Sequence, residues 1–139
     1  MTKDVMVYIR GISLEEENGA PVEVTAQGQY YYKNFQHVVF YQDSEGEHGG
    51  GKNMLKITRD KMVMKKSGRL ETIMEFQPGK EHLCDYRTPY GNMKVHTATR
   101  IYDVTEREHS LEIKLEYGLS MNGAYVSGCR LDILIESKK

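Results

Sequence analysis

The segment from Leu111 to Leu119 alternates strictly between large, mostly apolar residues and charged residues or glycine. The segment from Tyr125 to Ile135 repeats this alternation, with the small residues Ser127 and Cys129 among the alternating positions. A period of two places every second side chain on the same face of an extended strand, so that one face is buried and the other faces water. The same period recurs along almost the whole chain, and no segment clearly shows the period of an amphipathic helix. The sequence therefore predicts an all-β protein with an antiparallel sheet.

Turn residues divide the chain into short strands. The alternation predicts strands near residues 4–12, 21–27, 29–34, 36–43, 53–58, 61–66, 69–77, 81–88, 92–103, 110–120 and 124–136, where the second and third are one strand unless Gly28 breaks it. Ser67-Gly68 and Asn122-Gly123 are typical of tight hairpin turns, which make neighbouring strands antiparallel. Many short strands joined by hairpins favour a barrel or a sandwich, and closure removes exposed edges. We therefore predict one domain, residues 1–139, folded as a closed or nearly closed barrel of about 8–10 strands.

Composition narrows the class of protein further. The chain of 139 residues has a formal net charge of −1, which gives no general reason to expect nucleic acid or an anionic membrane as a partner. No apolar run reaches the roughly 18 residues that span a bilayer. The first residues enter a strand pattern at once and lack the features of a signal peptide. Without an export signal, Cys84 and Cys129 are expected to be reduced thiols in a cytoplasmic protein.

Alternation also assigns side chains to the inside of the barrel. The predicted inward set comprises Val5, Val7, Ile9, Leu70, Thr72, Met74, Phe76, Met93, Val95, Thr97, Thr99 and Ile101, with every second residue from Leu111 to Leu119 and from Ser127 to Ile135. Hydroxyl groups interrupt this apolar set at Thr72, Thr97, Thr99, Tyr117 and Ser127. They could contact a ligand in the lumen, but a buried threonine in a plain core also satisfies its hydroxyl on a nearby carbonyl.

Several short motifs resemble those of a known family in order and spacing. They are Gly28-Gln29-Tyr30, Val39-Phe40-Tyr41-Gln42-Asp43, Leu55-Lys56-Ile57, Lys66-Ser67-Gly68, Tyr86-Arg87-Thr88-Pro89-Tyr90-Gly91, Tyr117-Gly118-Leu119 and Leu131-Asp132-Ile133-Leu134-Ile135-Glu136. Over nearly its full length the chain is similar to the YwiB-like family, small bacterial proteins of uncharacterised function. The resemblance implies a calycin-like β-barrel, the architecture of lipocalins and fatty-acid-binding proteins, and brings no established activity. The family usually has Glu where this chain has Asp43 and Arg where it has Lys66, and lysine cannot form the bidentate fork of arginine.

Two local patterns carry candidate chemistry, and each has a simpler explanation. Residues Gly46–Lys52 match the letters of a phosphate-binding loop. Asn53 replaces the Ser or Thr that would hold magnesium, and the next residues have a strand pattern instead of a helix. His82 and Cys84 share one face of a strand and could form half of a zinc site or a nucleophile–base pair, yet no other histidine or cysteine has a matching spacing. We predict no metal, no cofactor and no catalytic residue, and an enzyme is the least favoured class.

Positive charge concentrates between Lys52 and Arg69. This segment contains Lys52, Lys56, Arg59, Lys61, Lys65, Lys66 and Arg69 against a single acid, Asp60. Such a hairpin could contact phosphates or an acidic protein, but it contains no aromatic residue that would stack on bases. Lysines on wet strand faces also protect sheet edges from aggregation. Nucleic acid is therefore a disfavoured partner, and a protein or RNA interaction module that uses hairpin 52–69 is kept as the alternative function.

Arg87 and Tyr90 flank a turn at an expected mouth of the barrel, where charged groups fix the polar end of a ligand. An ion pair between Arg87 and Asp43 across the rim would explain the same residues structurally. The leading hypothesis is a barrel that binds a small apolar or amphipathic molecule in its lumen. Its expected ligand contacts are Arg87, Tyr90, Thr97, Thr99, Tyr117 and Ser127. No membrane is expected as a partner, and the sequence leaves a homodimer open.

Overall fold

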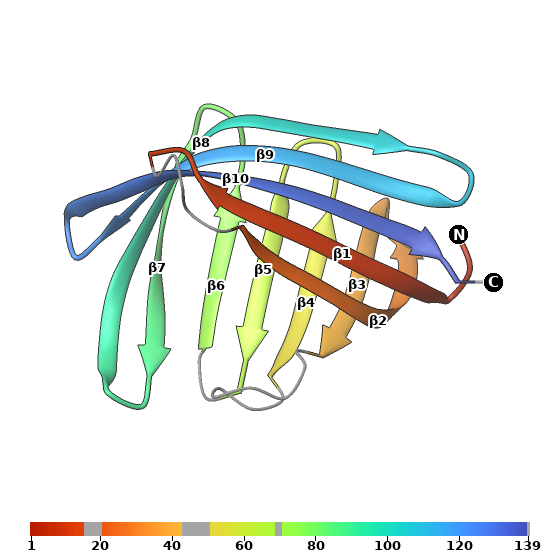
Figure 1. Cartoon of the computed structure of the whole chain (residues 1–139), viewed down its shortest axis with the longest axis horizontal. Coiled ribbons are helices and arrows are strands. Elements are labelled where there is room, and N and C mark those ends of the chain that lie inside the picture. Colours follow the sequence, from red (N-terminus) through yellow and green to blue (C-terminus); the bar gives the residue numbers. More distant parts are fainter. Residues whose placement is uncertain (16–20, 43–50, 69–70, 139) are drawn as a thin grey trace.

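The strands of this protein form one closed barrel. The computed structural model describes residues 1–15, 21–42, 51–68 and 71–138. Its strands are β1 (Asp4–Ser13), β2 (Val22–Lys33), β3 (Gln36–Gln42), β4 (Lys52–Ile57), β5 (Met62–Ser67), β6 (Glu71–Phe76), β7 (Glu81–Thr88), β8 (Gly91–Glu106), β9 (Ser110–Met121) and β10 (Ala124–Ser137). Each strand pairs antiparallel with the next, and β10 pairs with β1 to complete the circle (Figure 1). The predicted all-β antiparallel closed barrel is confirmed.

Apolar inward side chains fill the half of the barrel that contains the β4–β5 and β8–β9 turns. The fully buried side chains there are Val5, Val7, Val39, Leu55, Ile57, Met62, Phe76, Leu111, Ile113, Leu115, Ile133 and Ile135. The ring of Phe76 packs against Tyr117 on the far side of the core, with ring centroids 4.8 Å apart and planes tilted by 55°. This half, which we call the filled end, has the core that the alternation predicts.

β2 is a single strand of 12 residues that runs through Gly28 without a break. At Gly28 the strand changes neighbours, because this residue pairs with Val5 of β1 on one side and with Tyr41 of β3 on the other. A Cβ atom at position 28 would lie 2.7 Å from the carbonyl oxygen of Phe40. Glycine therefore allows three backbones to approach closely at this point.

Two β-bulges change which side chains face inward. The register between β8 and β9 shifts between Thr99 and Ile101. Beyond this bulge Tyr102 is 7% exposed and faces the core, whereas Ile101 is 42% exposed. The predicted inward position of Ile101 is therefore wrong, because one inserted residue reverses the alternation. A second shift, between Tyr125 and Ser127 of β10, likewise turns Tyr125 outward.

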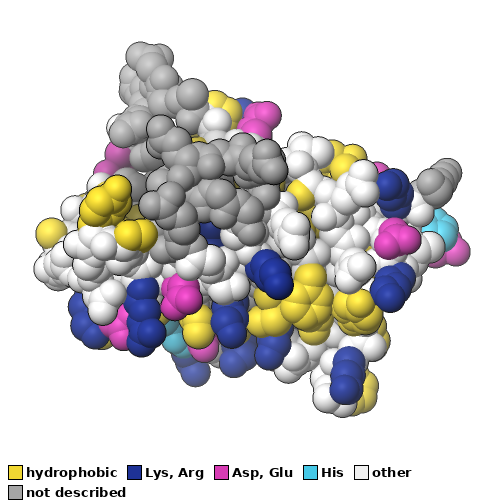
Figure 2. Space-filling model, turned by 90° about the horizontal axis from the view of Figure 1, so that it is seen from below, with side chains coloured by type: hydrophobic (Ala, Val, Ile, Leu, Met, Phe, Trp, Pro, Cys, Tyr) yellow, Lys and Arg dark blue, Asp and Glu magenta, His cyan; other side chains and the backbone are white. Residues whose placement is uncertain are grey.

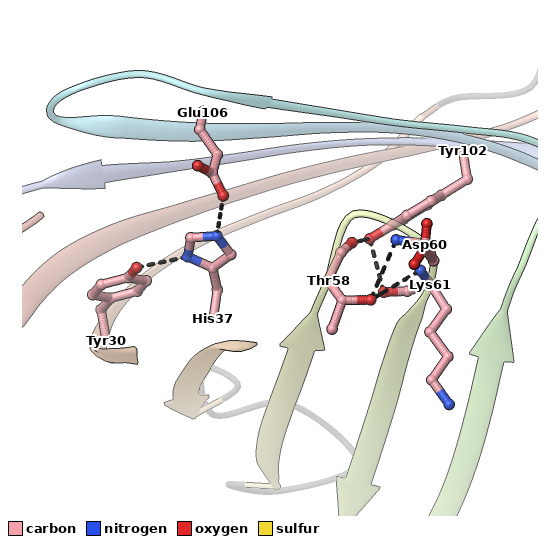
Figure 3. A network of polar contacts seen from close by, with 7 residues as sticks. All are labelled: Tyr30, His37, Thr58, Asp60, Lys61, Tyr102 and Glu106. Atoms are coloured by element: carbon pink, nitrogen blue, oxygen red, sulfur yellow. Dashed lines mark hydrogen bonds and ion pairs between the residues drawn. The ribbon is translucent and has the colours of Figure 1, made fainter. Parts of the chain in front are cut away.

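Polar contacts also cross the filled end of the barrel (Figure 3). His37 Nε2 on β3 lies 2.5 Å from Glu106 Oε1 on β8, and His37 Nδ1 lies 2.6 Å from the Tyr30 hydroxyl, so both ring nitrogens are hydrogen-bonded. The Tyr102 hydroxyl on β8 donates to the carbonyl oxygens of Thr58 and Lys61 in the β4–β5 turn, at 2.6 and 2.9 Å. Since β8 is a sheet neighbour of neither β3 nor β4, these contacts close the filled end across its interior.

The substitution Tyr102→Phe is expected to lower the free energy of unfolding by about 1–3 kcal/mol, because two carbonyl oxygens lose their shared donor. Burial raises the pKa of the Tyr102 phenol, so the folded protein holds this proton more tightly than the unfolded chain does. The stabilisation from this group is complete below the ordinary tyrosine pKa of about 10 and is lost as the pH rises above it. Urea unfolding from about pH 8 to about pH 11 should therefore show a smaller alkaline loss in the variant.

The control for this series is Tyr90→Phe, since the Tyr90 side chain is 95% exposed. It is expected to follow the wild-type pH dependence. An alkaline loss of stability that is the same in Tyr102→Phe and in the wild type would contradict the assignment.

Several predicted features lie outside the described residues. They are Leu70 of the inward set, Arg69 of the basic segment, Asp43 at the expected rim, and residues 46–50 of the segment that matches the phosphate-loop letters. In the parts of the chain that the structure describes, no helix is both long and apolar enough to cross a membrane.

Candidate functional site

The sheet is weakest between β6 and β7. In the described chain two residue pairs join these strands, Glu71 with Arg87 and Thr72 with Tyr86, whereas eight pairs join β7 to β8. The side chain of Thr97 on β8 reaches over to β6 and donates from Oγ1 to the Glu75 carbonyl oxygen at 3.0 Å. Residues 73–76 of β6 and 82–85 of β7 are not paired with each other in the sheet, and we call the region between them the β6–β7 gap.

A pocket of about 460 Å³ lies beside the β6–β7 gap. It is lined by Lys65, Lys66, Ser67, Glu71, Thr72, Ile73, Cys84, Asp85 and Arg87. Lys66, Thr72 and Cys84 occupy inward positions of their strands, while Lys65 and Arg87 are exposed on the outside. The pocket therefore connects the outer surface with the inner wall of the barrel. Its volume falls within the range of about 300–1,000 Å³ that is typical of small-molecule sites.

A row of polar side chains crosses the inner wall at the level of this pocket. The strand register pairs Tyr41 with Asn53, Asn53 with Lys66, Lys66 with Thr72, and Thr72 with Tyr86. Three of these residues are buried, and Lys66 and Tyr86 are half-buried. We call these five residues the polar row. A second pocket, of about 390 Å³, has Tyr41 and Asn53 in its lining, so the polar row runs from one pocket to the other.

Apolar side chains lie directly behind the polar row. The next inward residues of β5 and β6 are Met64 and Met74, which pair with each other, and Met62 and Phe76 follow them. Met64 and Met74 are only partly buried and pack against the core. Because methionine is flexible and polarisable, it adapts to irregular shapes. The inner wall therefore combines a polar rim with a deformable apolar floor, which suits an amphipathic molecule.

The charges around the pocket favour an anion. Lys94 Nζ lies 2.5 Å from Asp85 Oδ1, and this hydrogen bond, with a smaller contribution from Arg87, lowers the pKa of the Asp85 carboxyl. Asp85 is therefore an ionised carboxylate that Lys94 neutralises. Glu71 is the other acid in the lining, against Lys65, Lys66 and Arg87. Among the described lining residues, positively charged side chains therefore outnumber the acids.

Two of the predicted site residues are exposed. Arg87 lies in the lining of the pocket at the β6–β7 gap. Tyr90 lies in the turn between β7 and β8 and is 95% exposed. The proposed partner of Arg87 in a rim ion pair, Asp43, is outside the described residues.

The other predicted site residues lie on the inner wall of β8, β9 and β10. Thr97 and Thr99 are buried, and Thr97 is engaged with β6 as described above. The Thr99 hydroxyl has no hydrogen-bond partner among the described residues. Tyr117 is buried, which raises the pKa of its phenol, and Ser127 Oγ lies 3.4 Å from Cys129 Sγ. Thr97, Tyr117 and Ser127 therefore take part in contacts within the barrel.

His82 and Cys84, considered above for zinc or nucleophilic chemistry, contact different partners. His82 Nδ1 lies 3.4 Å from Glu75 Oε2, and Cys84 Sγ lies 3.7 Å from Thr72 Oγ1. Within the described residues, no three or more His, Cys, Asp or Glu side chains are grouped so that they could hold a metal ion. The structure therefore gives Cys84 a place in the pocket lining and pairs His82 with a carboxylate at the gap.

The network of Tyr30, His37 and Glu106 has the order of a nucleophile–base–acid triad. Burial and the nearby Glu106 carboxylate raise the pKa of the Tyr30 phenol. An activated nucleophile needs the opposite shift, towards easier loss of its proton. In the structure this network joins β2, β3 and β8 at the filled end.

Comparison with known proteins places this barrel in a family. A family model described as a domain of unknown function, DUF1934, matches residues 7–133 of the chain. The chain belongs to the DUF1934 family. The crystal structure of the ywiB protein from Bacillus subtilis is similar to this DUF1934 barrel with a TM-score of 0.85 and 18% sequence identity, over 99% of this chain and 93% of that one. No match was found among curated proteins. The resemblance to YwiB-like proteins is confirmed, and the polar row lies within the part of the chain that matches the DUF1934 model.

Proposed function

We propose that this DUF1934 barrel binds a small amphipathic molecule without catalysing a reaction. The anionic or polar end of the ligand lies at Arg87 and the polar row, and its apolar part lies against Met64 and Met74. The observation that carries the proposal is the pocket at the β6–β7 gap, because it joins an exposed cationic rim to inward-facing side chains.

The proposed direction of entry follows from the closure of the opposite end. Apolar packing and the contacts of His37 and Tyr102 occupy the filled end. Few residue pairs join β6 to β7. Separation of these two strands would therefore break fewer backbone hydrogen bonds than separation of other neighbouring strands of the barrel. The hydroxyls of Thr97, Thr99, Tyr117 and Ser127 on the inner wall would be reached only by a ligand that extends past the polar row, with Tyr90 outside at the turn.

Binding of 1-anilinonaphthalene-8-sulfonate, an amphipathic anion, tests this function by fluorescence titration. We expect saturable binding of one probe per barrel, weakened about two- to fivefold by Arg87→Gln because an exposed charge contact contributes modestly. The neutral analogue N-phenyl-1-naphthylamine should bind Arg87→Gln as it binds the wild type, since it has no anionic group. Thr72→Trp, which fills the pocket, should abolish binding of both probes.

The matched control is Arg107→Gln, which removes an exposed arginine paired with Glu112 at 3.1 Å on another part of the barrel. It should leave both affinities unchanged, and thermal melting should show that all variants are folded. The proposal fails if neither probe binds saturably, or if Thr72→Trp binds both probes as tightly as the wild type.

We also propose that the protein acts in the cytoplasm. Cys84 and Cys129 are free cysteines, which is the usual state of thiols in a reducing compartment. Fractionation of cells that express the untagged protein, with immunodetection, tests this location.

A further inference from the structure

Exposed lysines gather on the outer surface of the hairpin formed by β4 and β5. Lys52 and Lys56 on β4, Lys61 in the turn and Lys65 on β5 are exposed, while the alternate side chains of β4, such as Leu55, are buried in the core. Within the described chain, these four lysines form no ion pair, although ion pairs are common elsewhere on the barrel. The charge of these lysines is therefore presented to solvent and is not neutralised by any acid of the described residues.

The opposite outer wall is organised differently. On β8, β9 and the turn between them, Arg100 pairs with Glu116, and both Arg107 and Lys114 pair with Glu112. Among the described residues, exposed lysines without an ion pair are therefore concentrated on the hairpin of β4 and β5, in a chain whose formal net charge is −1. Such asymmetry attracts a polyanion to that side even though the whole molecule is nearly neutral.

Aromatic rings lie next to the unpaired lysines. Across the strands, Phe40 on β3 pairs with Met54 on β4, and Met54 pairs with Lys65 on β5. In a second line of paired residues, Tyr31 on β2 pairs with Val38 on β3, and Val38 pairs with Lys56 on β4. The Tyr31 and Phe40 rings are 40% and 43% exposed and stand edge to face, with centroids 6.0 Å apart. The view of the molecule from below in Figure 2 shows hydrophobic side chains (yellow) beside Lys and Arg side chains (dark blue). We call Tyr31, Phe40 and the four lysines the basic aromatic face.

We propose that the basic aromatic face binds single-stranded nucleic acid, with phosphates on the lysines and bases stacked on Phe40 and Tyr31. Hairpin 52–69 alone contains no ring for stacking, which is why its sequence disfavours nucleic acid. The fold supplies the rings from β3, which pairs with β4 of that hairpin, and from β2, the next strand in the barrel. Stacking on an exposed ring accepts any base, so this binding would tolerate different sequences.

The charges at the borders of the basic aromatic face indicate the path that a bound nucleic acid would take. Glu71 and Glu75 on β6 lie beyond the lysines on one side and would repel phosphates. On the other side the ammonium of Lys3 lies 5.6 Å from the centre of the Tyr31 ring, which adds a cation where the rings are. A polyanion is therefore directed from β5 towards β2, across the lysines and then over the rings. An acidic polypeptide would use the lysines but would have no planar bases to stack on the rings.

Fluorescence anisotropy of a labelled single-stranded oligouridylate at increasing salt tests the proposal. If four phosphates are neutralised, the logarithm of the binding constant should fall with the logarithm of salt concentration with a slope of about −2.8. The double variant Lys56→Gln/Lys61→Gln should reduce this slope to about −1.4. Phe40→Ala should weaken binding about tenfold without changing the slope, because it removes stacking and no charge.

The control is the double variant Lys114→Gln/Arg107→Gln, which removes the same charge from the opposite wall and should bind like the wild type. Phe40→Leu is the second stacking variant in case Phe40→Ala unfolds. Binding of 1-anilinonaphthalene-8-sulfonate to Lys56→Gln/Lys61→Gln should stay unchanged, because neither lysine lines the described pockets, so this face and the pocket are tested separately.

Three outcomes overturn the inference. The first is no binding of the oligonucleotide at low salt. The second is an oligonucleotide affinity that depends on the lysines but is the same in both Phe40 variants as in the wild type, together with equally tight binding of poly-L-glutamate. This result would identify an acidic polypeptide as the partner. The third is preferential binding to phosphatidylglycerol vesicles that the oligonucleotide does not displace, which would identify an anionic lipid surface.

Discussion

Phe76→Ala is expected to lower the free energy of unfolding by about 3–5 kcal/mol. The Phe76 side chain is fully buried and packs on Tyr117, with ring centroids 4.8 Å apart. Removing the ring deletes its buried apolar contacts and leaves a cavity that the surrounding strands can close only in part. Phe76 is part of the core of the filled end and follows Met74 on the inner face of β6, so the loss should be seen in the whole cooperative transition. Urea unfolding followed by circular dichroism measures it as a lower midpoint.

The same strand offers a matched control for this experiment. Ile73 on β6 faces outward and is 48% exposed. Ile73→Ala deletes a large apolar side chain from the same short strand but creates no internal cavity, so a loss below about 1 kcal/mol is expected. Equal losses at the two positions would contradict the assignment of Phe76 to the core.

Gly28→Ala is expected to destabilise the barrel by about 2–3 kcal/mol. The added methyl group would lie 2.7 Å from the Phe40 carbonyl oxygen and 3.1 Å from a Val7 methyl group. Relief of this overlap requires β2 to move away from β1 or from β3, and either movement weakens ladder hydrogen bonds. Thermal melting gives the size of the effect, and amide hydrogen exchange should show faster exchange in β2 and in the strand from which it separates.

Gly118 provides the comparison for Gly28. It is also a glycine inside a strand, β9, but a Cβ atom there would meet nothing closer than 3.8 Å. Gly118→Ala should therefore be neutral or slightly stabilising, because alanine reduces the entropy of the unfolded chain. A large loss at Gly118, or none at Gly28, would show that close backbone approach is not the reason for glycine at position 28.

The class of fold could be predicted from the sequence because it depends on a local property. Alternation is visible in every strand, and it assigned Val5, Ile113 and Ile135 to the core, as the structure confirms. The bulge between Thr99 and Ile101 could not be predicted, since it inserts one residue in a strand whose side chains on both faces are large enough to be buried. Its consequence is that Tyr102, and not Ile101, reaches the β4–β5 turn.

The polar row could be predicted only in part. Each member is an even number of residues away from inward-facing residues of its own strand and therefore faces inward too. Asn53 is two residues from Leu55, and Lys66 is two residues from Met64. The alternation was sufficient to assign Thr72 to the inside, but it does not give the register that aligns residues of five strands at one level. Register depends on turn lengths and on pairing between distant segments. The β6–β7 gap also arises because most residues of β6 and β7 do not pair with each other, and a sequence has no local signal for the absence of such pairing.

The pairing of β1 with β10 has a consequence for how the molecule forms. Val5 pairs with Ser137 and Ser13 with Cys129, so this ladder joins segments that are far apart in the chain, while the other strands pair with their immediate successors. Contacts of such long range form slowly, because the entropy of closing the loop is lost before any hydrogen bond is gained. During synthesis β1 therefore keeps one bare edge until β10 has been made. The native barrel has no exposed edge between these strands, but the nascent chain has one for most of its time on the ribosome, and protection from aggregation is needed at that stage.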